Sequence, residues 1–101
     1  MSDFVDDITR SRRLATLRVV RENEGAVNES VLRQALHLLG FRGRLQTDEA
    51  LAGDAEMLER AGLVTIVYWE GRVRTLEISR RGRSYLDRRV DPITGIDYPE
   101  A

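Results

Sequence analysis

Residues 58–86 read LERAGLVTIVYWEGRVRTLEISRRGRSYL, and the residue pattern changes its period inside this stretch. The segment 63–69 is rich in β-branched and aromatic residues, and the segment 73–78 alternates between apolar and polar side chains. Both features are typical of β-strands, and Glu70-Gly71 between them offers a turn. The stretch therefore predicts a β-hairpin over residues 63–78.

A helix is expected directly after this hairpin. Ser79 can cap a short closing helix over about residues 80–90, with Tyr85 and Leu86 on its inner side. Asp91-Pro92 would end this helix, because the residue before a proline avoids helical geometry.

Three further helices are expected before the hairpin. The first spans about residues 6–23, with a partial apolar stripe and Gly25 as its stop, and the third spans about residues 47–61, with Thr47 as its N-cap. The second, from the N-cap Asn28 to the residue before Gly40, has the clearest amphipathic pattern. Its expected core-facing stripe consists of Val31, Leu32, Ala35, Leu36 and Leu39.

This order of elements predicts a mainly helical α+β fold of the winged helix-turn-helix type. Residues 40–46 would form the turn, the third helix would be the recognition helix, and residues 69–73 would be the tip of the wing. We expect a winged-helix domain over residues 1–90 and a C-terminal tail over residues 91–101. The tail carries several sizeable apolar side chains, so it can fold back on the domain, dock on a partner or dock on a second copy.

The composition restricts the class of protein. A chain of 101 residues with 42% hydrophobic residues fits one globular domain. The absence of cysteine excludes disulfides, thiol catalysis and cysteine-bound metals. The sequence has no apolar run of about 18 residues that could span a bilayer, and its first residues are acidic where a signal peptide is basic. We therefore expect a soluble, cytoplasmic and unprocessed protein.

The formal net charge of −1 gives no reason to expect a polyanionic partner, but the charges are unevenly distributed. Residues 80–90 contain five arginines against one aspartate. The best candidates for binding DNA phosphates are Arg72, Arg74, Arg80, Arg81 and Arg83. The alternative is a solvated face that pairs with the acidic third helix or the tail. A second group is expected to be surface charge and consists of Arg10, Arg12, Arg13, Arg18 and Arg21.

The expected recognition helix is poorly suited to DNA. A recognition helix presents the side chains of its N-terminal half to base edges and phosphates. The candidates for that exposed position here are Asp48, Glu49, Gly53, Asp54 and Glu56. Four carboxylates beside a phosphate backbone are unfavourable, so this helix is not expected to read the major groove. The alternative is that its acidic surface binds a basic protein partner.

Two parts of the sequence resemble known winged-helix proteins. The segments 58–64 (LERAGLV) and 78–86 (ISRRGRSYL) are similar to the recognition-helix exit and the closing helix of many bacterial winged-helix regulators. The whole chain, including Arg12-Arg-Leu-Ala and Asn28-Glu-Ser-Val-Leu, resembles small repressor-like winged-helix proteins of Mu-like phages and prophages. The resemblance implies a winged helix of bacterial or phage origin, and it does not supply a target.

The residue pattern does not favour an enzyme. His37 is the only histidine and lies off the apolar stripe, without a placed nucleophile or carboxylate partner. The glycines form no nucleotide-binding fingerprint, and the acidic residues of the third helix are not gathered by a loop, so we expect no cofactor and no metal. Tyr68 and Trp69 are neighbours on a strand, so one of them should face outward as a contact surface, unless the hairpin packs against the closing helix.

Two functions remain open. The first is a DNA-binding protein, acting in transcription regulation or DNA handling, that contacts double-stranded DNA through the wing and closing-helix arginines. It could form a homodimer through the first helix and the tail. The second is a protein-interaction module that uses the acidic third helix and binds no DNA. On this second hypothesis, arginine substitutions of Asp54 or Glu56 should leave the fold intact and disrupt a complex.

Overall fold

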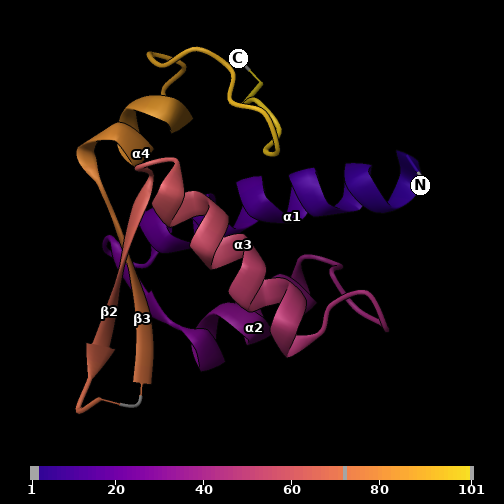
Figure 1. The fold of residues 1–101 in the computed structure, drawn as a ribbon, viewed down its shortest axis with the longest axis vertical. Helices are drawn as coiled ribbons and strands as arrows, with labels where there is room; N and C mark the ends of the chain where they lie inside the picture. Colours follow the sequence, from indigo (N-terminus) through magenta and orange to yellow (C-terminus); the bar gives the residue numbers. More distant parts are fainter. Residues whose placement is uncertain (1–2, 72, 101) are drawn as a thin grey trace.

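The computed structural model describes residues 3–71 and 73–100 of the chain. These residues form four helices and three strands in an α+β arrangement (Figure 1). The elements are α1 (Asp3–Glu22), β1 (Ala26–Asn28), α2 (Glu29–Leu38), α3 (Asp48–Arg60), β2 (Val64–Trp69), β3 (Val73–Ile78) and α4 (Arg80–Leu86). The predicted α+β class is confirmed, and the element order matches the expected one apart from the added strand β1.

The sheet is antiparallel, with the order β1-β3-β2. The predicted hairpin supplies β2 and β3, and Leu76 at the centre of β3 pairs with Ile66 on one side and Val27 on the other. The chain enters β1 through Glu24 and Gly25, whose φ angles of 62° and 90° turn it sharply out of α1. This short strand was not predicted, because three residues are too few to show a period.

The helix boundaries follow the predicted caps at most ends. Three predicted N-cap side chains accept first-turn N–H groups: Asn28 from Val31, Thr47 from Ala50 and Ser79 from Gly82. The predicted end of the closing helix near residue 90 is wrong. The helix α4 ends at Leu86, where Arg88 has a φ of 62° and the Arg89 N–H donates to the Ser84 carbonyl, as in a Schellman motif.

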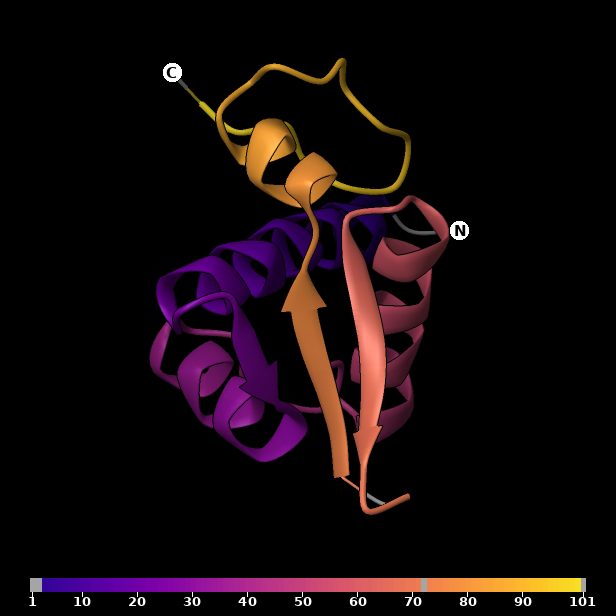
Figure 2. The ribbon, with the colours of Figure 1, turned by 90° about the vertical axis from the view of Figure 1, so that its left-hand side faces the viewer.

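The core lies between the inner face of the sheet and the helices. Figure 2 views the sheet from its outer face, with α1 and α3 behind it. The side chains that are fully buried between these layers include Leu17, Val20, Leu58, Leu63 and Leu76. Burying an aliphatic side chain of this size contributes about 1.5–3 kcal/mol, so this layer is the main source of stability.

The C-terminal tail folds back on the domain, which is the first of the three expected alternatives. Ile96 is buried in the main core, and the Tyr85 hydroxyl donates to the Asp97 carbonyl oxygen over 3.0 Å. The ring of Tyr98 packs edge-on against that of Tyr85, with ring centroids 5.4 Å apart. Burial raises the pKa of Tyr85 above its ordinary value of 10.0, so the hydroxyl keeps its proton and remains a donor to the tail.

Candidate interaction surfaces

Asp54 of α3 is a core residue, so the expectation that it is exposed is wrong. The residue is 1% exposed, and its carboxylate accepts hydrogen bonds from two arginines of α1. Arg12 donates from Nε to Oδ2 and from Nη2 to Oδ1, the latter over 3.1 Å, and Arg13 donates from Nε to Oδ1 over 2.9 Å. The expectation that Arg12 and Arg13 are surface charges is therefore also wrong.

The two arginines also hold the turn before α3 and the tail. Arg12 donates from Nη1 to Gln46 Oε1 over 2.8 Å, and Arg13 donates from Nη1 to the Gly95 carbonyl oxygen over 2.9 Å. This buried cluster of Arg12, Arg13 and Asp54 thus joins α1 to α3, to the turn and to the tail. It is a structural cluster, because its charged groups are occupied by one another and by backbone carbonyls.

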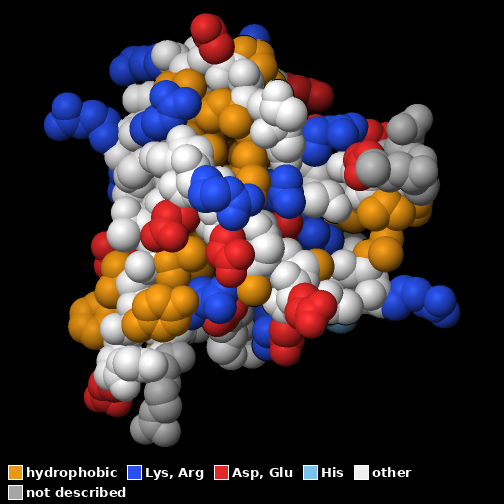
Figure 3. All heavy atoms as spheres, viewed as in Figure 1, with side chains coloured by type: hydrophobic (Ala, Val, Ile, Leu, Met, Phe, Trp, Pro, Cys, Tyr) orange, Lys and Arg blue, Asp and Glu red, His pale blue; other side chains and the backbone are white. Residues whose placement is uncertain are grey.

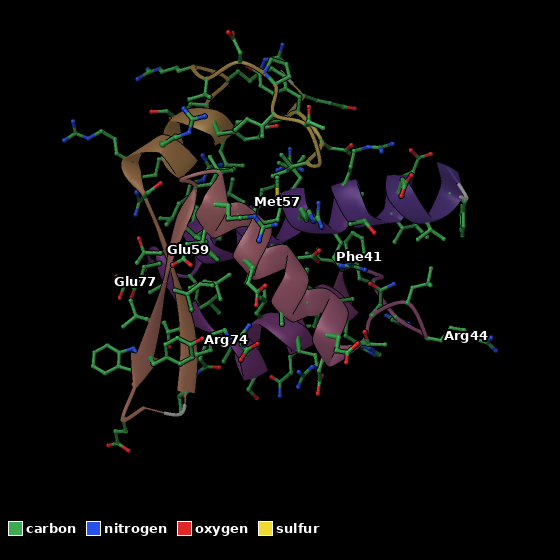
Figure 4. The ribbon with its side chains drawn as sticks, in the orientation of Figure 1. Phe41, Arg44, Met57, Glu59, Arg74 and Glu77 are labelled. Atoms are coloured by element: carbon green, nitrogen blue, oxygen red, sulfur yellow. The ribbon has the colours of Figure 1, made fainter. Side chains whose placement is uncertain are left out.

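The exposed side of α3 is acidic toward its N-terminus. Asp48, Glu49 and Glu56 are exposed, and Gly53 is half-buried. Asp48 accepts a hydrogen bond from Arg33 of α2 over 2.5 Å. Glu59 points from α3 to β2, where its Oε2 accepts the Ile66 N–H over 2.9 Å and closes part of the free edge of the sheet (Figure 4).

Among the candidate phosphate-binding arginines that the structure describes, Arg74 and the three arginines of α4 do not lie on one surface. Arg74 is half-buried between β3 and α2, with its Nε 3.5 Å from Glu29 Oε1, and Arg72 lies outside the described residues. The helix α4 lies at the opposite end of the hairpin from its turn (Figure 1). The six-residue strands between these two ends span about 20 Å. Arg74 and the arginines of α4 therefore do not form one compact phosphate-binding patch.

Two of the three arginines of α4 also have contacts within the chain. Arg81 donates from Nε to the Ala61 carbonyl oxygen over 2.9 Å, at the end of α3. The guanidinium of Arg83 lies over Gly25. Arg80 is exposed, as are Arg88 and Arg89 directly after the helix. A basic surface therefore exists at the α4 end of the molecule, away from α2 and the turn before α3.

The hairpin carries an apolar groove near its turn. Residues that pair across two strands share a face, so Trp69 and Val73 lie together on the outer face of the sheet. With Ala26, Thr75 and Val31 of α2 they line a groove of about 460 Å³. Figure 3 shows hydrophobic side chains gathered over this end of the hairpin, away from α4.

The apolar surface continues from the groove along α2. A second groove, of about 320 Å³, shares Val31 with the first and is lined further by Ala35, Leu38 and Leu39. Leu39 was expected in the core with Leu32 and Leu36, but only the latter two are buried, and Val31 and Leu39 are exposed. The expected stripe ran past the end of α2, because the helix ends at Leu38 and Leu39 is its C-cap residue. We call the joined surface the apolar band, made of Ala26, Val31, Ala35, Leu38, Leu39, Trp69 and Val73.

Tyr68 and Trp69 are both 57% exposed, although they lie on opposite faces of β2. The alternative that the hairpin end packs against the closing helix is wrong, because α4 lies at the other end of the strands (Figure 1). Tyr68 pairs with Arg74 on the inner face, and Trp69 lines the groove on the outer face. An exposed tryptophan in an apolar groove is the kind of residue that dominates the binding energy of protein interfaces.

Comparison of the chain with protein-family models, curated proteins and solved structures gave no match. The resemblance to winged-helix proteins of Mu-like phages therefore stays a prediction. Within residues 3–71 and 73–100, no helix has the length and apolar character needed to cross a membrane, and no group of three or more potential metal ligands is gathered. The functional argument therefore rests on the surfaces of this chain.

Proposed function

We propose that this chain is a protein-binding module of the winged helix-turn-helix type, and that the apolar band is its binding surface. The observation that carries the proposal is the groove at Trp69 and Val73, which continues onto α2. Contiguous exposed apolar surface of this kind is typical of protein-interaction sites. The order of α2, turn, α3 and hairpin supports the winged-helix arrangement, and the resemblance to phage and prophage regulators agrees with it.

The charge on α3 favours a protein partner over the major groove of DNA. The side chains that α3 would present to base edges include Asp48, Glu49 and Glu56, which are all exposed carboxylates. Asp54 is removed from this surface by its burial against α1. The acidic side of α3 and the apolar band are separate surfaces of the chain, and the band contains the groove of about 460 Å³ at Trp69.

In a pull-down from a lysate of the cells that naturally make this protein, the tagged chain is expected to capture its partner. Trp69→Ala is expected to abolish this capture. The indole is an exposed wall of the groove, and truncating such an anchor typically costs an interface about 2 kcal/mol or more. The measurement is quantitative mass spectrometry of the captured proteins. Tyr68→Ala is the matched control, because Tyr68 is equally exposed on the same strand and lies on the other face. Equal loss with both variants, or loss with neither, would contradict the proposal.

DNA binding is the second candidate function, and the exposed arginines at the α4 end favour it. Arg80→Glu combined with Arg89→Glu is expected to abolish salt-dependent binding of a labelled DNA duplex, measured by fluorescence anisotropy at two salt concentrations. Arg44→Glu is the control, because Arg44 is exposed and points away from the body of the molecule at the turn before α3 (Figure 4). If the unmodified chain binds no duplex at low salt, this candidate function is excluded.

A further inference from the structure

The apolar band has an exposed pair of leucines at one end and the larger of its two grooves at the other. At one end Leu38 and Leu39 project from the end of α2, with 79% and 60% of their surface exposed. At the other end lies the groove of about 460 Å³ between Trp69, Val73 and Ala26. A projecting pair of leucines and an apolar groove are complementary features, and both are on the same chain.

The spacing of these ends suits a two-fold arrangement. Val31 borders the groove, and Leu39 is eight residues further along the chain, about 12 Å at the helical rise. Ala35 lies between them on the same surface, and its small side chain allows a second helix to approach closely. A two-fold interface requires that each feature on one copy meets its complement on the other, in both directions.

The charges at the two ends are also complementary. Glu70 lines the groove, and Glu24 follows Asn23, which lines it as well. At the leucine end, Arg42 is exposed and its Nε donates to the His37 carbonyl oxygen, which holds the side chain beside the end of α2. An antiparallel approach of two copies therefore brings the basic end of each band to the acidic end of the other.

We propose that a second copy of this chain occupies the groove. Two α2 helices pack antiparallel across a two-fold axis near Ala35, and Leu38 and Leu39 of each copy enter the groove of the other. The inference rests on the proposed function, because it assigns a partner to the same apolar band. This arrangement does not use the tail as a dimer contact. The tail is already bound to its own domain by hydrogen bonds from Tyr85 and Arg13.

Sedimentation velocity of the full chain tests this inference. We expect a concentration-dependent species of twice the chain mass of 11.5 kDa. Leu38→Glu is expected to raise the dissociation constant of the dimer by at least about thirtyfold, because it places a charge in the apolar groove of each partner. Phe4→Glu is the control, because Phe4 is also a highly exposed apolar residue on a helix but lies outside the band.

A charge-reversal series tests the antiparallel arrangement. Arg42→Glu alone is expected to weaken the dimer, and adding Glu24→Arg and Glu70→Arg is expected to restore it, since both ends are then reversed. A triple variant that is weaker than Arg42→Glu alone would overturn the arrangement. A chain that stays monomeric, or a dimer that is insensitive to Leu38→Glu, would overturn the inference. A monomeric chain that still shows Trp69-dependent capture would leave the proposed function intact.

Discussion

Asp54→Asn is expected to lower the free energy of unfolding by about 3–5 kcal/mol, the usual cost of removing one partner of a buried ion pair. Asparagine keeps the shape of aspartate but lacks its charge, and it offers one acceptor oxygen where the carboxylate uses both. Arg12 would then be a buried cation without its counter-charge. A loss of this size is a large part of the stability of a domain of this length.

The control for this prediction is Glu56→Gln, the same chemical change two residues further along α3. Glu56 is exposed, so its substitution should change the unfolding free energy by less than about 0.5 kcal/mol. Urea unfolding followed by far-UV circular dichroism measures both variants. If the two substitutions have similar effects, the buried cluster does not hold α1 to α3.

A double substitution separates the cost of unpaired charge from the cost of lost packing. Arg12→Met combined with Asp54→Leu replaces the buried pair with apolar side chains of similar volume, a change that is often neutral or stabilising. Arg13 also loses Asp54 in this variant, but its side chain is 21% exposed and keeps its hydrogen bond to the Gly95 carbonyl oxygen. We expect the double variant to be clearly more stable than Asp54→Asn. These results would also explain why Asp54→Arg cannot test an interface: it would place a third cation beside Arg12 and Arg13 and unfold the chain.

Local signals made most of the fold predictable from the sequence. The caps at Asn28 and Thr47 and the alternation of residues 73–78 depend on neighbouring residues, so they can be recognised without tertiary information. The strand β1 depends on β3, which lies more than forty residues later and provides all its pairing. The early end of α4 depends on the left-handed conformation of Arg88. Glycine, and less often asparagine, is the usual residue in this conformation at a helix end, so an arginine gave no signal that the helix ends there.

The surfaces were harder to predict than the fold, because the exposure of a side chain depends on packing between elements that are distant in the sequence. Asp54 follows Leu51 by three residues and precedes Leu58 by four, so it occupies a core-facing position of α3. That spacing indicates that Asp54 is buried, but its charge led us to expect an exposed residue. The exposure of Leu39 had no comparable signal, because a wide apolar stripe on α2 fits both a deeper core and a binding surface.

Gly82→Ala is expected to destabilise the fold by about 3 kcal/mol, at the upper end of the range for overpacked cores. A Cβ at this position would overlap the Leu63 carbonyl oxygen and lie 2.7 Å from Ile78 Cγ1, so the backbone of α4 would have to move. The movement would disturb the cap, because Ser79 Oγ accepts the Gly82 N–H and donates to the Gly62 carbonyl.

Gly53→Ala is the matched control for Gly82→Ala, because the same methyl group is added to a helix where it meets nothing within 4 Å. Alanine in a helix interior is favoured over glycine by about 1 kcal/mol, so Gly53→Ala should raise the melting temperature by roughly 4–8 °C. Gly82→Ala should lower it by a larger amount. If the same substitution has opposite effects at the two positions, close contact with Leu63 and Ile78, and not helix propensity, requires a glycine in α4. Stabilisation by both alanines would mean that α4 does not pack as closely on Leu63 and Ile78 as the structure has it.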